Sequence, residues 1–180
     1  MSVVIESTLL SDVLVLQVQR HHDSRGFFEE LGREGELAKM GIPPFLQTNH
    51  SRSTRNVVRG LHAQPNMGKL LFVLTGTIQL VELDIRPSSP MFGKHASIIL
   101  SDADAHGVWI PPGHANGFCT ISDSADVLYQ CTTNYDNEMQ VRIHPLDSVL
   151  AITWMTNAPV ISEQDATAPS WLDVLDRLGK

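Results

Sequence analysis

The densest group of residues that could do chemistry lies between positions 47 and 69. This window holds four of the thirteen basic residues of an acidic chain, whose net charge is -7. Arg59 and His62 belong to the run Val57-Val58-Arg59-Gly60-Leu61-His62, whose apolar neighbours indicate a strand. Polar side chains on such a strand either point to water or line a pocket, so a solvated face and a binding site are both open.

A second basic element lies upstream, in the run 23–30 around Arg25. The planar guanidinium groups of Arg25 and Arg59 suit bidentate binding of phosphate. Residue types alone support an anion site and an ordinary surface equally well.

The elements that must position these residues are mostly strands. The best hairpin signal is 70–74, then Thr75-Gly76-Thr77, then 78–85. In the second arm apolar and polar residues alternate, which predicts one buried face and one wet or functional face. Further strands are predicted at 13–18, 95–101, 106–110, 117–121, 125–132 and 140–144.

Two segments have helical patterns, at 33–40 and 170–178. The second has Ser170 as its N-cap and Asp173 as a capping-box partner. Its apolar stripe, which we expect to pack on the barrel or on a partner subunit, comprises Trp171, Val174, Leu175 and Leu178. Many short strands with helices only at the margins predict an all-β jelly roll with short peripheral helices.

Length and composition narrow the class of protein. The chain has 180 residues, 42% of them apolar, which predicts one domain over 1–180 with a sizeable core. The negative charge argues against nucleic-acid binding, and no apolar run reaches the roughly 18 residues of a membrane span. The N-terminus lacks the features of a signal peptide, and Cys119 and Cys131 are expected to be reduced and buried, which predicts a cytoplasmic protein.

Motifs in order over residues 4 to 172 resemble the dTDP-4-dehydrorhamnose 3,5-epimerase family. They are Arg25-Gly26-Phe27-Phe28, Arg59-Gly60-Leu61-His62, Lys69-Leu70, Asp84-Ile85-Arg86, Ser89-Pro90-Met91-Phe92-Gly93, Trp109-Ile110-Pro111-Pro112-Gly113, Tyr129-Gln130-Cys131-Thr132, Tyr135 and Asp165-Ala166-Thr167-Ala168-Pro169. The resemblance implies a cupin-type jelly roll (a double-stranded β-helix), no cofactor and a homodimer. It also implies a nucleotide-linked 4-keto-6-deoxyhexose as substrate.

The resemblance implies residue roles as well. His62 matches the general base and Asp165 the aspartate that orients it. Tyr129 matches the proton donor on the opposite face, and Lys69 the lysine beside the keto oxygen. Five further residues match family positions that hold the nucleotide sugar: Arg25, Glu30, Gln47, Asn49 and Arg59. Tyr135 matches the aromatic residue that stacks on the base.

These roles agree with elementary chemistry. Abstraction of a proton next to a ketone requires stabilisation of the enolate that forms. A hydrogen-bond donor such as Lys69 at the enolate oxygen typically raises the rate by about 10²–10³-fold. A neutral His62 can accept the proton near pH 7, and general acid–base action adds roughly 10²–10⁴. Inversion also requires a second group opposite the base. Without the resemblance, however, Tyr129 would be taken for a strand tyrosine and Asp165 for a loop carboxylate.

The sequence argues against a metal site, because most of the cupin metal ligands are replaced. In the cupin metal pattern His62 would be the first ligand, but Gln64 replaces the second histidine and Lys69 the carboxylate. Asn116 stands where the last histidine should follow Pro111-Pro112-Gly113. A divalent metal needs three or four suitable donors, so we predict none.

Two positions depart from the family pattern. Asn116 replaces a histidine that contacts the substrate, with His114 two residues earlier on the same strand face, and Gln140 stands where the family often has glutamate. Both are expected at the substrate and away from the base–acid pair. The alternatives are therefore a 3- or 5-epimerase or a ketoisomerase acting on another nucleotide sugar, a non-catalytic sugar-binding cupin, or a metal-dependent dioxygenase.

Overall fold

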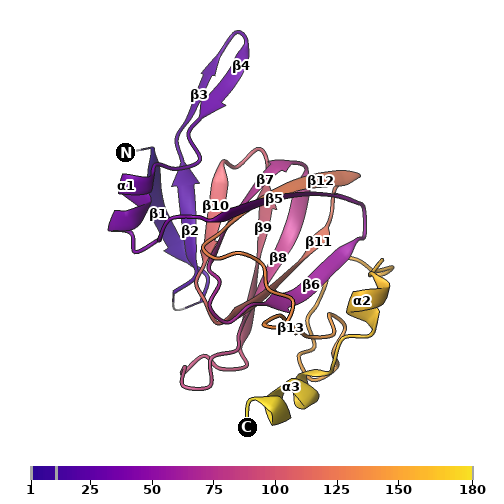
Figure 1. Cartoon of the computed structure of the whole chain (residues 1–180). Helices are drawn as coiled ribbons and strands as arrows, with labels where there is room; N and C mark the ends of the chain where they lie inside the picture. The colour runs from indigo at the N-terminus through magenta and orange to yellow at the C-terminus, as the bar shows by residue number, and fades with distance from the viewer. Residues whose placement is uncertain (1, 11, 180) are drawn as a thin grey trace.

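The computed structural model describes residues 2–10 and 12–179, and their strands form two facing sheets (Figure 1). The six-stranded sheet has the order β1-β2-β10-β7-β12-β5, with β1 Val3–Thr8, β2 Leu14–Val18, β10 His106–Ile110, β7 Lys69–Thr75, β12 Ser124–Cys131 and β5 Gln47–Thr54. The five-stranded sheet has the order β13-β6-β11-β8-β9, with β13 Val141–Arg142, β6 Val58–Ala63, β11 His114–Thr120, β8 Thr77–Asp84 and β9 His95–Ser101. This is the predicted all-β jelly roll.

Apolar residues form three layers around the two sheets. The central layer lies between the sheets and includes Leu71, Leu80 and Phe118. The outer side of the six-stranded sheet is covered by residues around helix α1 (Glu34–Lys39), and that of the five-stranded sheet by the C-terminal segment. Both sheets are therefore buried on two faces over much of their area, which explains why strands such as β11 are apolar or buried throughout.

The predicted hairpin at 70–85 is wrong, although both of its strands exist. β7 pairs with β10 and β12, whereas β8 pairs with β11 and β9 in the other sheet. The turn at Gly76 thus carries the chain from one sheet to the other. Gly76 has φ +82, and a Cβ there would lie 2.1 Å from the carbonyl oxygen of Ser124, so glycine is required.

The polar face predicted for β8 is not wet. Glu82 and Asp84 are both fully buried, on the side of the strand that faces the opposite sheet. Cys119 and Cys131 are buried and unpaired, as expected.

The helices lie at the margins. Helix α3 (Trp171–Arg177) has the predicted capping box between Ser170 and Asp173, and its apolar stripe packs on the outer layer of the five-stranded sheet. A further short helix, α2 (Glu163–Ala166), lies beside β6. No helix of the described part of the chain is long and apolar enough to span a membrane.

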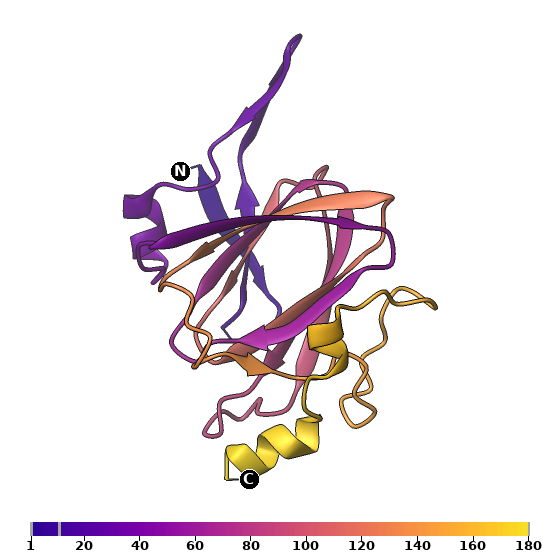
Figure 2. The same cartoon turned by 45° about the vertical axis from the view of Figure 1, so that its right-hand side comes forward.

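A two-stranded hairpin projects from the barrel. It consists of β3 (Arg20–Asp23) and β4 (Gly26–Glu29), and Figures 1 and 2 show it standing clear of both sheets. Phe27 and Phe28 on it are 55% and 65% exposed, which is unusual for phenylalanine.

Candidate active site

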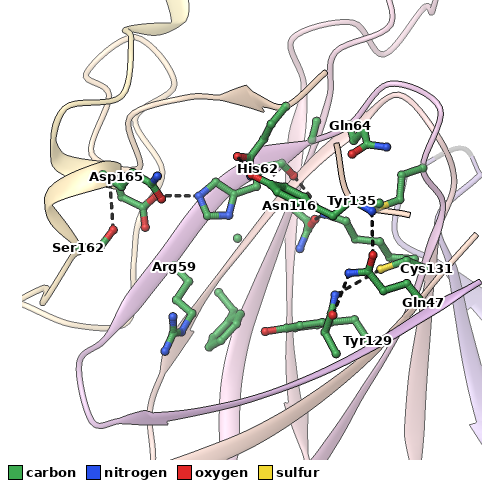
Figure 3. A pocket seen from close by; sticks show the side chains of 18 residues that line it. Gln47, Arg59, His62, Gln64, Asn116, Tyr129, Cys131, Tyr135, Ser162 and Asp165 are labelled. Atoms are coloured by element: carbon green, nitrogen blue, oxygen red, sulfur yellow. Dashed lines mark hydrogen bonds and ion pairs between the residues drawn. The ribbon is translucent and has the colours of Figure 1, made fainter. Parts of the chain in front are cut away.

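A cavity of about 350 Å³ opens between the two sheets. Ten of the twelve predicted site residues line it (Figure 3): Gln47, Asn49, Arg59, His62, Lys69, Asn116, Tyr129, Tyr135, Gln140 and Asp165. They come from β5, β6, β7, β11, β12, α2 and the loop around β13, so the fold gathers residues up to 118 positions apart in the sequence.

A bulge in β6 turns two of these side chains to the same side. Arg59 and His62 are three residues apart, so strict alternation would place them on opposite faces. Arg59 pairs with Phe118 and His62 with Asn116, which leaves one extra residue in β6 between the two pairs. Both side chains therefore line the cavity, while Leu61 packs in the outer layer.

His62 and Asp165 form a close pair on one wall of the cavity. His62 Nε2 lies 2.6 Å from Asp165 Oδ1 (Figure 3). Burial raises the pKa of Asp165, but hydrogen bonds from His62, Ser162 and the Gly60 backbone outweigh this and leave the pKa below its ordinary value. Asp165 is therefore an ionised acceptor, and the Nε2–H of His62 donates to it, which leaves Nδ1 free to accept a proton.

Lys69 and Tyr129 lie on other parts of the wall. Lys69 Nζ donates to Asn116 Oδ1 at 2.6 Å, and the Tyr129 hydroxyl donates to Ser51 Oγ. Burial raises the pKa of Tyr129, which keeps the phenol protonated and able to act as an acid. The cavity thus brings together an imidazole paired with a carboxylate, a phenol and an amine.

A separate polar cluster surrounds Tyr135 at the mouth. The Tyr135 ring is about half exposed, its hydroxyl donates to Gln140 Oε1 at 2.9 Å, and its backbone N–H donates to Gln47 Oε1 at 2.7 Å. Gln47 in turn donates to Asn49. An exposed ring held by amides suits stacking against a planar base.

Comparison with known proteins places these features in a family. The family model for dTDP-4-dehydrorhamnose 3,5-epimerase matches residues 7–173. The chain belongs to this family. A crystal structure of the 3,5-epimerase from Legionella pneumophila, in complex with dTDP-4-keto-L-rhamnose, is 38% identical with a TM-score of 0.91, over 98% of this chain and 96% of that one.

Two other relatives of this epimerase-family chain are informative. A dTDP-4-dehydrorhamnose 3,5-epimerase of Neisseria gonorrhoeae is 39% identical over 91% of this chain, which spans only 51% of that relative's length. A 3'-monoepimerase of Streptomyces bikiniensis, solved with dTDP-quinovose, is 28% identical with a TM-score of 0.88, over 96% of this chain and 91% of that one.

Two predicted site residues do not reach the cavity of their own chain. Arg25 and Glu30 belong to the projecting β3–β4 hairpin and the residue after it. Arg25 pairs with Asp23 at 2.6 Å, and Glu30 pairs with Arg33 at 2.7 Å. His114 does not reach the cavity either, because its side chain is buried against Arg86 and the carbonyl of Pro111.

Sequence reasoning missed the residues that support Asp165. Ser162 caps helix α2, its Oγ accepting from the Asp165 backbone N–H at 3.1 Å, and Gln164 also lines the cavity. The spacing of Ser162 and Asp165 is an N-cap signature that could have revealed the helix. Among the described residues no three His, Cys, Asp or Glu side chains group together as metal ligands would.

Proposed function

We propose that this chain epimerises a nucleotide-linked 4-keto-6-deoxyhexose, converting dTDP-4-dehydro-6-deoxyglucose to dTDP-4-dehydrorhamnose. Family membership supports the substrate class. The observation that carries the proposal is the placement of the His62–Asp165 pair, Lys69 and Tyr129 around one cavity. None of these steps needs a cofactor, and we propose none.

The proposed reaction moves one proton at a time. Nδ1 of His62 takes the proton from a carbon next to the ketone, and Asp165 stabilises the resulting imidazolium. The C–H electron pair becomes part of an enolate, whose oxygen receives the charge-assisted hydrogen bond of Lys69. The Tyr129 hydroxyl then delivers a proton to the other face of the carbon. Solvent reprotonates Tyr129 and takes the proton from His62.

The remaining lining residues are proposed to bind the nucleotide sugar. Arg59 is a cation at the cavity wall and suits a phosphate, and its Nε is held by Ser53 Oγ at 2.8 Å. Tyr135 would stack on the base, and the amides Gln47, Asn49 and Gln140 around it would bind polar edges.

We further propose a cytoplasmic homodimer of single-domain chains. The hairpin with exposed Phe27 and Phe28 projects from the barrel, and neither Arg25 nor Glu30 lines the cavity, so a second copy would be needed to bring them to a substrate. The shared central layer supports one domain over 1–180, and the two unpaired buried cysteines are typical of a reducing compartment.

The alternative is a variant that inverts a single carbon. Asn116, where the family usually has histidine, accepts the hydrogen bond of Lys69 and so alters the group beside the keto oxygen. Similarity to a 3'-monoepimerase agrees with this alternative.

Deuterium labelling distinguishes the 3,5-epimerase from the variant that inverts a single carbon. The chain is incubated with dTDP-4-keto-6-deoxyglucose in deuterated water, and NMR and mass spectrometry locate the label. We expect deuterium at carbons 3 and 5 with inversion. Label at one carbon would establish a monoepimerase. A keto group at carbon 3 would establish a ketoisomerase, and a sugar that binds but stays unlabelled would establish a non-catalytic protein. Tyr129→Phe should exchange deuterium without full inversion, because only delivery from the far face is lost.

A further inference from the structure

Glu82 is a buried acid that the reaction above does not use. The residue is fully buried on β8, and neither carboxyl oxygen has a hydrogen-bond partner within the described chain. A carboxyl group in that state destabilises a fold, and an apolar side chain of similar volume would be less costly. The position therefore calls for a function that offsets the cost.

The register places Glu82 behind the cavity wall, next to Lys69. Glu82 is the cross-strand partner of Asn116, and Asn116 Oδ1 accepts the hydrogen bond of Lys69 Nζ. Glu82 itself does not line the cavity. It can therefore act on a bound sugar only through its neighbours that line the cavity, of which Lys69 is the one that can carry a charge.

We propose that Glu82 is a positioning residue whose carboxylate is the counter-charge that keeps Lys69 cationic. This deepens the proposed function, since the ammonium form is the one that would stabilise an enolate oxygen. A neutral amine at the same place would donate a much weaker hydrogen bond. Asn116 fixes the direction of the amine, but its amide oxygen carries no charge and does not titrate.

The charges around the pair support this role. Burial lowers the pKa of Lys69, and the groups that oppose this are Glu82 from β8 and Cys131 from β12. Burial raises the pKa of Glu82 well above its ordinary value, and Lys69 is the group that opposes it. Each member of the pair thus favours the charged form of the other, and the two titrate as a unit.

The test follows Lys69 directly, without substrate. The chain has only four lysines, so NMR of protein labelled with ¹³C at the lysine ε-carbon resolves them, and Lys69→Met identifies the Lys69 signal. In Glu82→Gln the midpoint of the Lys69 titration should fall by at least about one pH unit, because the negative charge is gone. Glu82→Met, which fills the same space without charge, should give the same change.

Two variants serve as controls. Glu82→Asp keeps the carboxyl group and should hold the midpoint closer to that of the unmodified protein. Glu34→Gln removes an exposed acid on α1 and should leave the Lys69 midpoint unchanged. An unchanged Lys69 midpoint in both Glu82→Gln and Glu82→Met would overturn the proposal, whatever the chain does to a sugar.

Activity gives the second readout. In Glu82→Gln the alkaline limb of the kcat profile should move to lower pH together with the NMR midpoint, with KM little changed. In a Lys69→Met background Glu82→Gln should have no added effect on kcat. A further loss there would mean that Glu82 acts by another route. A protein whose Lys69 midpoint responds to Glu82 but which never labels the sugar would refute the epimerase function and leave the pairing intact.

Discussion

The two ring nitrogens of His62 have different surroundings, and this difference suits the residue to the proposed role of base. Nε2 lies 2.6 Å from Asp165, whose pKa is held below its ordinary value, so the carboxylate remains ionised throughout the range in which histidine titrates. The free nitrogen faces the cavity, and the imidazolium that forms on proton transfer is stabilised by the adjacent charge.

Replacing His62 tests this assignment. His62→Asn should lower kcat by about 10² or more, because no other histidine of the described chain lines the cavity, while nucleotide-sugar binding is little changed. Turnover measured by NMR and binding measured by calorimetry give the two quantities. His144→Asn, in a loop outside the cavity, is the matched control and should behave as the unmodified protein. Near-normal turnover in His62→Asn would remove His62 from its role.

At the scale of elements, local patterns predicted the strands from β6 onwards and β2, but missed β1, β3, β4 and β5 and predicted strand partners poorly. The bounds of β9 and β10 agree with the predicted 95–101 and 106–110, and helices α1 and α3 are confirmed. The turn at 75–77 has the same local signature whether the following strand pairs in the same sheet or crosses to the other. Pairing depends on contacts distant in sequence, so alternation of apolar residues could not decide it.

The bulge in β6 was hidden for a similar reason. An alternating pattern places Arg59 and His62 on opposite faces, and only the observed register shows that both point inward. Gly60 inside the strand was a signal for a bulge, because glycine in a strand interior often marks one. The alternation in β8 marked the face of Glu82 as wet or functional but could not show that Glu82 is buried, since its burial follows from the opposite sheet.

The sheet-crossing turn can be tested at Gly76. Gly76→Ala combines a positive φ with a Cβ that would overlap the Ser124 backbone, and should destabilise the protein by about 2–4 kcal/mol. Gly41→Ala has a similar φ of +80 but open space around the Cβ, and should cost about 1–2 kcal/mol. Urea unfolding measures both. Equal losses would show that the backbone conformation alone, and not the close approach, demands glycine at 76.

At the scale of the whole molecule, an ion cluster ties the N-terminal loop to the barrel. Arg86 contacts both Asp84 on β8 and Asp12 in the loop before β2. Burial raises the pKa of Asp84, but hydrogen bonds from Arg86 and Ser89 prevail and lower it from 3.8 to about 2. The carboxylate form is thus preferred in the folded state.

Stability should therefore depend on Asp84 and on pH. The contribution of Asp84 is fully present above its ordinary pKa of 3.8 and is lost as the pH falls to about 2. Asp84→Asn should lower the free energy of unfolding at pH 7 by about 2 kcal/mol, and the difference should shrink between pH 4 and 2. Asp123→Asn, which breaks the exposed pair with Arg55, should cost well under about 1 kcal/mol. A difference for Asp84→Asn that persists at pH 2 would contradict the linkage.

The proposed dimer depends on the projecting hairpin. Replacing Phe27 and Phe28 with aspartate should give a folded monomer by light scattering, with activity reduced because Arg25 and Glu30 no longer reach a neighbouring cavity. Val149→Asp changes a residue as exposed as Phe27, at 55%, in the segment between β13 and α2, and this variant should remain dimeric. A hairpin variant that is still dimeric would place the interface elsewhere.

The late position of Asp165 in the chain has a consequence for protein synthesis. His62 and its carboxylate partner are 103 residues apart, and α2 follows all the strands of the described chain. Because domains form from the N-terminal side as a ribosome extends them, the strands around His62 emerge well before helix α2 does. A nascent chain therefore carries the His62 imidazole without its carboxylate partner until the segment that follows β13 has emerged.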